Sequence, residues 1–212
     1  MTKIVSEIGW NHMGDMDLAE KMIKSCSENG ADYAKFQTWS VKRLKYVKIA
    51  SFDSDNIDLL KFCNDNFETM FISTGTKTVD EVKSSVSREN IPDAKIIVLH
   101  CISSYPLEPK NVNLPRINSF KKIYDKVGYS DHTFGVETTK AALEYDIDIV
   151  EKHFTLDRDL PGRDNKFAIL PHEMLELTNY IKMREEMNIS HGDGYLECEQ
   201  EARDVMTGRF DG

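Results

Sequence analysis

Short apolar runs rich in β-branched residues alternate with longer amphipathic stretches, and this alternation restricts the folds that the chain can adopt. The strand-like runs are Lys3–Ile8, Asp32–Gln37, Tyr46–Ala50, Met70–Ser73, Lys95–Cys101, Val127–Ser130 and Ile147–Phe154. The helix-like stretches are Asp17–Asn29, Asn56–Asn66, Val79–Arg88, Leu114–Asp125, Gly135–Tyr145 and Pro171–Met187. Strand and helix in turn, at intervals of roughly 20 to 30 residues, indicate a parallel α/β architecture.

A doubly wound sheet and a TIM barrel both fit about seven parallel strands. No Gly-x-Gly-x-x-Gly follows the first strand, so the usual dinucleotide-binding fingerprint is absent. Thr78 is the predicted N-cap of the third helix, with Glu81 as its capping-box partner. One interval breaks the rhythm, because the eight residues Thr38–Lys45 between the second and third strands are too few for a crossover helix.

Composition narrows the class of protein. The 212 residues carry 27 Lys+Arg against 36 Asp+Glu, a net charge of −9, and 40% of them are hydrophobic. This acidic balance disfavours a nonspecific binder of nucleic acid or of anionic membranes. No apolar run approaches the ~20 residues of a membrane span, and the start lacks the layout of a signal peptide. Because the four cysteines lie far apart without a Cys-x-x-Cys pair, we expect a reduced, cytoplasmic protein.

Polar side chains gather where the predicted strands end. In chain order they are Glu7, Asn11 and His12; Lys35 and Gln37; Lys48 and Ser51; Ser73, Thr74 and Gly75; His100, Ser103 and Tyr105; Ser130, Asp131 and His132; and Glu151 and His153. A single lysine or serine at a strand end is usually a solvated loop residue. Polar clusters at seven successive strand ends favour a functional site instead. In a parallel barrel the carboxyl ends of the strands share one face, and that face carries the active site.

The residue types in these clusters suit an anion. Ammonium groups and hydroxyls are the donors that hold phosphate or carboxylate, and they are supplied here by Lys35, Lys48, Ser51, Ser73 and Ser130.

Two histidines end neighbouring predicted strands, so their imidazoles are expected within reach of one metal ion. These are His132 and His153, with Asp131, Glu151 or Asp164 as members of the surrounding shell. An isolated histidine is more often a packed core or surface residue, but the adjacent strand ends favour a ligand role. Two imidazoles without a third strong protein ligand would leave the site open for water and substrate, which is typical of catalytic metals.

At this point the sequence resembles a family, the N-acetylneuraminate (sialic acid) synthases. The segments that carry the resemblance are Ser6–Asp15, Lys35–Gln37, Lys48–Ser51, Ile72–Gly75, Leu99–Cys101, Tyr105–Pro106, Gly128–Thr133, Glu151–Thr155 and Leu160–Asp164. They follow the family's order from residue 3 to about 190. The resemblance implies a TIM-barrel-like synthase domain over residues 1–190, with residues 191–212 as a C-terminal tail.

The resemblance also implies a reaction and a set of site residues. The family condenses phosphoenolpyruvate with an open-chain, N-acetylated amino sugar, using a divalent metal (Mn²⁺ first, with Mg²⁺ or Co²⁺ open). The implied phosphoenolpyruvate ligands are Lys48, Ser51, Ser73, Ser103 and Ser130, with Lys35 assisting. The implied metal ligands are His132 and His153. The implied sugar contacts are Glu7, Gln37, Tyr105 and Asp164, with Glu7 the candidate for proton transfer.

The departures from the family are as informative. Family members have a further strand, ending in Ser-Thr-Pro-Phe, at the place of the eight-residue gap, and a small C-terminal domain that contributes an arginine to the sugar site. This sequence matches neither, and Arg209 corresponds to nothing in that domain. Retention of the ligand positions favours an active synthase. Loss of a strand and of the arginine domain favours a non-catalytic remnant that serves as a binding or assembly subunit. A separate chain that supplies the missing parts is a third alternative.

The gap also leads to an expectation about assembly. A chain that crosses Thr38–Lys45 without a helix leaves one flank of the barrel uncovered, and bare apolar surface facing water is disfavoured. We therefore expect a homodimer that buries the flank near Phe36, Trp39 and Tyr46, with Lys42, Arg43 and Lys45 at its rim. Whether seven strands close, and which amino sugar is used, the sequence leaves open.

Overall fold

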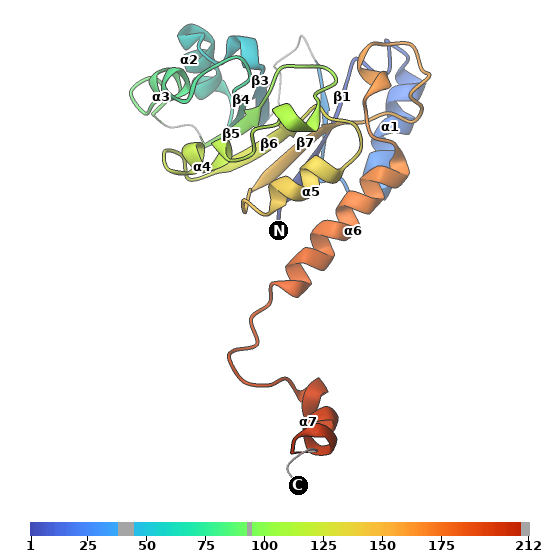
Figure 1. Cartoon of the computed structure of the whole chain (residues 1–212). Coiled ribbons are helices and arrows are strands. Elements are labelled where there is room, and N and C mark those ends of the chain that lie inside the picture. The colour runs from blue at the N-terminus through green and yellow to red at the C-terminus, as the bar shows by residue number, and fades with distance from the viewer. Residues whose placement is uncertain (38–44, 93–94, 209–212) are drawn as a thin grey trace.

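The computed structural model describes residues 1–37, 45–92 and 95–208. Its strands form one parallel sheet with the order β2-β1-β7-β6-β5-β4-β3. The strands are β1 Lys3–Gly9, β2 Tyr33–Phe36, β3 Tyr46–Ile49, β4 Thr69–Ser73, β5 Lys95–Cys101, β6 Val127–Asp131 and β7 Ile149–His153. The sheet curves into a half-barrel with helices on its outer side (Figure 1). The expected parallel α/β barrel with about seven strands is confirmed.

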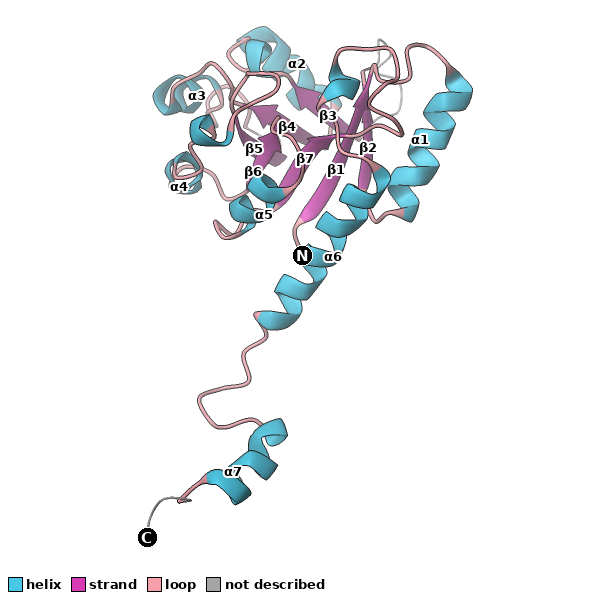
Figure 2. Ribbon diagram, turned by 45° about the vertical axis from the view of Figure 1, so that its right-hand side comes forward, coloured by secondary structure: helices cyan, strands magenta, loops and turns pink. Residues whose placement is uncertain are grey.

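Among the described residues an α-helix follows every strand except β2, and Figure 2 shows the helices around the sheet. They are α1 Met16–Glu28, α2 Ile57–Asn66, α3 Val79–Ser85, α4 Arg116–Lys121, α5 Glu137–Leu143, α6 Pro171–Met187 and α7 Gln200–Met206. Short 3₁₀ turns span Ser51–Asp53, Pro109–Asn111, Asp164–Lys166 and Glu197–Glu199. Helix α6 has the expected bounds, and α3 begins with the expected capping box between Thr78 and Glu81.

Helix α4 is shorter than the amphipathic stretch Leu114–Asp125 suggests. Pro115 is its N-cap, and the amides of Ile123 and Tyr124 both donate to the Phe120 carbonyl, which tightens and ends the last turn. The Tyr124 hydroxyl donates to carbonyls at the end of α3. The chain therefore leaves the helix early to fix α4 against α3.

The sheet is open between β2 and β3. Each of these strands has one hydrogen-bonded neighbour, whereas β1 pairs with both β2 and β7 and so joins the first and last strands of the chain. The open place lies where the eight-residue interval interrupts the sequence pattern. At its amino end, the rings of Tyr33 on β2 and Tyr46 on β3 contact each other with centroids 5.7 Å apart. The expected crossover lies largely in residues 38–44, outside the described residues.

Two apolar clusters lie on opposite faces of the sheet. The larger one packs outward-facing strand residues such as Ile4, Met70 and Val150 against the helices. The smaller one consists of strand residues alone, with Phe71 and Leu99 at its centre. Because successive side chains on a strand alternate between faces, the residues two positions on from this inner cluster project inward at the carboxyl ends. These positions hold the candidate site.

The region after α6 stands apart from the barrel. An extended segment leads from α6 to α7, and α7 lies well away from the sheet in both views (Figures 1 and 2). The boundary expected near residue 190 stays a prediction. Among the residues described, no helix combines the length and apolar character that crossing a membrane requires.

Candidate functional site

The carboxyl ends of the strands bring two buried carboxylates and two lysines together inside the half-barrel. Lys35 on β2 forms an ion pair with Glu7 on β1. Lys48 on β3 forms one with Glu151 on β7, with Nζ and Oε1 3.2 Å apart. Glu7 and Glu151 are 3% and 5% exposed, so both pairs lie out of bulk water. The strands β3 and β7 are not adjacent in the sheet, and Lys48 reaches Glu151 across the concave interior.

The two carboxylates differ in their proton affinity. Burial raises the pKa of Glu7, and the neighbouring Glu151 charge adds to this effect against the opposing pull of Lys35. Burial also acts to raise the pKa of Glu151. The ammonium groups of Lys48 and Lys35 outweigh it, and the Ser130 hydroxyl, which donates to Glu151 Oε1 at 2.7 Å, adds to the lowering. The site thus holds one carboxylate that stays ionised and one that accepts a proton more readily.

Three serines form the second part of the site. The Gly75 amide donates to Ser51 Oγ at 3.0 Å, and a Cβ added at Gly75 would collide with Ser103 Oγ. A glycine is therefore required for these hydroxyls to approach the loop backbone. The hydroxyls of Ser73 and Ser103 are buried and have no hydrogen-bond partner within the described residues. Buried polar atoms without partners are rare in native proteins, so these hydroxyls are available to ordered water or to a polar ligand.

The two histidines lie side by side above the ionic cluster. The ring centroids of His132 and His153 are 5.6 Å apart, and Tyr105 lies over His132 with centroids 4.1 Å apart. His132 Nδ1 donates to the Ile102 carbonyl at 2.9 Å, which leaves the Nε2 lone pair available. Asp164 Oδ2 lies 3.9 Å from His153 Nδ1.

These donors suit a divalent metal at an open site. Two imidazoles offer borderline nitrogen ligands, and the remaining coordination positions would go to water or substrate. Burial lowers the pKa of His153 well below its usual range, which favours the neutral form that binds metal. Burial also acts to lower the pKa of His132, but the contact with Cys101 outweighs it and raises that pKa. Over the described part of the chain, no group of three or more His, Cys, Asp or Glu residues is arranged to hold a metal ion.

The structure places the sequence-predicted residues at one end of the barrel. Gln37, which is exposed, follows β2 close to Gly9 at the end of β1. Two of the predicted anion ligands differ from expectation in one respect. Lys48 and Ser130 already contact the carboxylate of Glu151. Glu151, which the sequence analysis treats only as a member of a metal shell, therefore lies between Lys48 and Ser130 in the ionic cluster. The contact between Glu151 on β7 and Lys48 on β3 forms only because the sheet is curved, since the two strands are not adjacent.

The expectation that Asp131 belongs to the metal shell is wrong. Strand alternation turns Ser130 and His132 inward and Asp131 outward. Asp131 there accepts hydrogen bonds from Thr138, Thr139 and the Thr133 amide, and forms a 2.9 Å ion pair with the buried Lys152. The same alternation places Lys152 between the inward-facing Glu151 and His153, so the signal was present in the sequence.

Comparison with known proteins gives a consistent result. The model of the NeuB family matches residues 41–193. An uncharacterized protein of Methanocaldococcus jannaschii is 31% identical, with 88% of this chain and 72% of the relative covered. An N,N'-diacetyllegionaminic acid synthase of Campylobacter jejuni is 26% identical, with 91% and 78% covered. The human N-acetylneuraminate-9-phosphate synthase is also 26% identical, with 96% and 76% covered.

Solved structures agree. An N-acetylneuraminic acid synthetase of Leptospira borgpetersenii in complex with citrate superposes with a TM-score of 0.85 at 27% identity, and covers 97% of this chain and 92% of that one. The alignments to the M. jannaschii and human relatives run over 241 and 271 residues, more than the 212 of this chain. Those relatives therefore carry residues that have no counterpart here.

Proposed function

Because the chain belongs to the NeuB family, we propose that it is a C–C bond-forming transferase that condenses phosphoenolpyruvate with an N-acetylated amino sugar. The products are a sialic or other nonulosonic acid and phosphate. Relatives named as N-acetylneuraminate-9-phosphate, diacetyllegionaminic acid and pseudaminic acid synthases support this reaction class. The observation that carries the proposal is the convergence of two lysines, two unpartnered serine hydroxyls and a histidine pair at one end of the barrel.

Phosphoenolpyruvate would bind against the lysines and serines. Its phosphate and carboxylate need several charge-assisted donors, and Lys48, Ser51, Ser73, Ser103 and Ser130 supply them from four different segments. Glu151 must give up some of its contacts with Lys48 and Ser130 when the dianion enters. The citrate named with the Leptospira relative is, like phosphoenolpyruvate, a small organic polyanion, which supports an anion-binding role for this fold.

The sugar would lie between the anion site and the histidines. Glu7, paired with Lys35, is the proposed proton-transfer residue, because burial raises its pKa toward the range in which a carboxyl can exchange protons. Gln37, Tyr105 and Asp164 would orient the sugar hydroxyls and amide. Holding two reactants in one water-poor site accounts for much of the rate gain in such a condensation.

A divalent metal would be held by His132 and His153. When bound, it would act as a Lewis acid that polarises the sugar carbonyl. Mn²⁺ is the proposed ion, with Mg²⁺ or Co²⁺ as alternatives.

A binding or assembly subunit without catalysis is the second candidate. Two observations favour it: both site lysines are already paired with carboxylates, and the sheet is open between β2 and β3. We also propose a cytoplasmic homodimer that covers this open flank. Phe36 is half-buried and Tyr46 is 44% exposed, while Trp39 lies outside the described residues. Light scattering at micromolar concentration tests the dimer, and a stable monomer would contradict it.

The experiment that separates the two functions is phosphate release by the purified chain. It is incubated with phosphoenolpyruvate, Mn²⁺ and, in turn, N-acetylmannosamine or the bacillosamine-derived precursors of legionaminic and pseudaminic acid. We expect release that depends on one of the sugars, with the sugar-free reaction as control. Phosphoenolpyruvate binding in calorimetry without release for any sugar would instead establish the non-catalytic function.

A further inference from the structure

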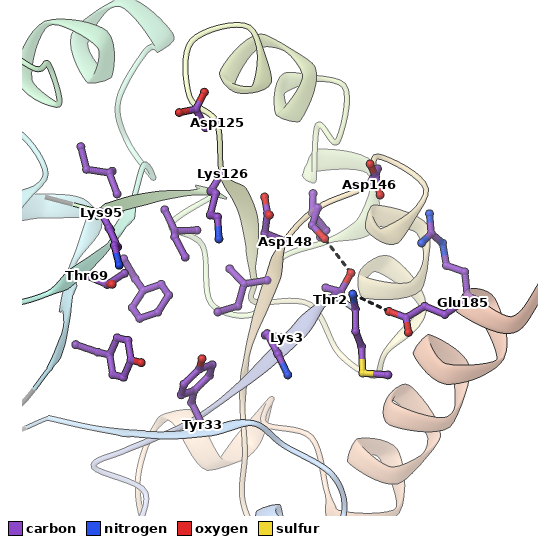
Figure 3. A pocket seen from close by; sticks show the side chains of 18 of the residues that line it. Thr2, Lys3, Tyr33, Thr69, Lys95, Asp125, Lys126, Asp146, Asp148 and Glu185 are labelled. Carbon is purple, nitrogen blue, oxygen red and sulfur yellow. Dashed lines mark hydrogen bonds and ion pairs between the residues drawn. The ribbon is translucent and has the colours of Figure 1, made fainter. Parts of the chain in front are cut away.

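A second concave surface lies at the opposite end of the half-barrel, where the strands begin. It is a cavity of about 1050 Å³ (Figure 3). Tyr33, Phe71, Ile97 and Ile149, which belong to the inner apolar cluster, line its floor. The amino end of the barrel core therefore opens onto this cavity.

Lysines stand around the mouth of the cavity. Figure 3 shows Lys95 and Lys126 at neighbouring strand starts, together with Lys3. Lys3 pairs with Asp32 at 2.7 Å, whereas Lys95 and Lys126 form no ion pair with any described residue. The acidic residues of the lining are Asp125, Asp146, Asp148 and Glu185. Glu185 is paired with the N-terminal ammonium group, and Asp148 accepts a hydrogen bond from the Val127 amide.

The segment after α6 starts at the rim of this cavity. Arg184, Glu185 and Asn188 of the α6 end line the cavity, and residues 189–208, here named the tail, continue from there. The tail carries five acidic side chains and one arginine. Its apolar side chains are exposed to water, with Tyr195 at 52% and Val205 at 67%.

The tail has local contacts of its own after a glycine-containing start. The Tyr195 hydroxyl donates to Gln200, and Arg203 lies over the Tyr195 ring at 4.3 Å. The preceding Gly192 has a φ of +81° and, like Gly194, has no neighbouring atoms that restrict it. The seven Cα-to-Cα steps from Asn188 to Tyr195 span up to about 24 Å when extended, whereas a compact cavity of this volume is about 13 Å across. The tail can therefore reach every part of the cavity without moving α6.

We propose that the tail folds back in the same chain and closes the cavity at the amino end of the barrel. Tyr195 and Leu196, together with the apolar side of α7, would cover the floor formed by Tyr33 and Phe71. The acidic side chains would lie against Lys95 and Lys126, which lack carboxylate partners within the described residues. One contact thus accounts for two features of the extended arrangement: lysines at the cavity mouth without a carboxylate partner among the described residues, and an apolar, acidic tail that faces water.

Disulfide trapping tests this contact, because Cys198 in the tail is exposed and the other three cysteines are buried. Lys126→Cys places a partner thiol at the cavity mouth. The matched control is Lys182→Cys on the exposed side of α6, which is near the tail in sequence and does not line the cavity. With oxidised glutathione, we expect the Lys126→Cys chain to form its intramolecular disulfide about tenfold faster, because docking raises the effective concentration of Cys198 there.

A second test removes charge from the tail. Glu197→Gln with Glu201→Gln in the Lys126→Cys chain should slow trapping severalfold, as should 1 M salt, because both weaken the attraction between the tail and the remaining Lys95. A tail that moves freely would instead reach Lys182→Cys at least as fast as Lys126→Cys. That result, or a disulfide formed between two chains in place of one within a chain, would overturn the proposal.

Discussion

At the carboxyl end of the half-barrel, Lys35 and Lys48 are partly buried and each lies against a buried carboxylate; at the amino end, Lys95 and Lys126 are exposed and have no carboxylate partner among the described residues. Lys35, Lys48 and Lys95 lie on strands of one sheet, and Lys126 directly precedes β6. Burying charge costs several kcal/mol per ion, and paired burial seldom stabilises a fold more than apolar packing would. The carboxyl-end charges are therefore best explained by ligand chemistry, and the amino-end charges by contact with water or with another segment.

Substitution of the two histidines should give the largest difference in activity between changes at the carboxyl end and changes at the amino end. We expect His132→Ala combined with His153→Ala to abolish metal-dependent condensation while the chain stays folded, because the described residues contain no group of three or more His, Cys, Asp or Glu side chains that could replace the pair as ligands. Lys95→Ala combined with Lys126→Ala is the matched change at the amino end and should leave activity intact. Calorimetry with Mn²⁺ measures the ligand role directly. Unchanged Mn²⁺ affinity in the histidine variant would refute the assignment.

Substitution in the buried ion pair between Lys152 and Asp131, on the outer face of the sheet at its carboxyl end, should also have a large effect on stability. Lys152 is 1% exposed, and it donates to the Thr133 carbonyl as well as pairing with Asp131. Lys152→Met leaves the Asp131 charge buried without its partner, which should cost about 3–5 kcal/mol in the free energy of unfolding. Lys24→Met, which removes an exposed pair with Glu28, should cost less than about 0.5 kcal/mol. Equal losses in urea denaturation would show that the buried pair contributes nothing special.

Acid should lower the free energy of unfolding through protonation of His100. Burial lowers the pKa of this histidine to about 4, and its Nε2 donates to the Val112 carbonyl at 2.8 Å. In the unfolded chain its pKa is about 6.5, so between these values the unfolded state binds more protons and stability falls as the pH falls. The contribution is fully present above pH 6.5, and about 3 kcal/mol of it is lost by pH 4.

A variant isolates this contribution. His100→Gln removes the titrating group and retains a donor for the Val112 carbonyl. Between pH 7 and pH 4.5, urea unfolding of the wild type should lose more stability than unfolding of the variant. Parallel pH profiles for the two proteins would contradict the assignment.

The sequence predicted the secondary-structure elements better than the side-chain contacts between them. The strands and α6 follow from local apolar patterns and from a proline at the first helical turn, which act over a few residues. The interval Thr38–Lys45 also located the open place in the sheet. The contact between Lys48 and Glu151 could not be predicted, because β3 and β7 are four places apart in the sheet and only its curvature brings their side chains together.

Other parts of the site were within reach of the sequence but needed a different rule. Strand alternation alone turns Asp131 away from Ser130 and His132, and it could have excluded Asp131 from the metal shell. The amino-end cavity had no such signal. Lys95 and Lys126 are ordinary polar residues at strand starts, and only the folded sheet shows that they surround one opening.

The lysines themselves provide a direct comparison of the two ends. Lys48→Ala should weaken phosphoenolpyruvate binding by about 2 kcal/mol, or roughly thirty-fold, because a charge-assisted bond to a dianion is lost. Lys126→Ala removes an equal charge from the opposite end and should change the affinity less than twofold. Calorimetry with phosphoenolpyruvate measures both. Similar losses would mean that the long-range field of the protein, and not a pocket, attracts the ligand.

The smallest expected effect concerns the open place between β2 and β3. At the carboxyl end nothing described joins Lys35 to Lys48 directly, since each pairs with a different carboxylate. At the amino end the rings of Tyr33 and Tyr46 meet, and Phe71 lies within 6.4 Å of both. Edge-to-face rings stabilise each other by about 1 kcal/mol beyond the area that they bury.

A double-mutant cycle with Tyr33→Leu and Tyr46→Leu should therefore give a coupling energy of about 1 kcal/mol in urea denaturation. Tyr33→Leu with Tyr180→Leu is the control, because Tyr180 lies on α6 and packs with Lys140 instead, so its coupling should be near zero. If Tyr33 and Tyr46 are coupled no more strongly than the control pair, the aromatic contact does not hold the two edge strands together, and the open flank depends on contacts elsewhere.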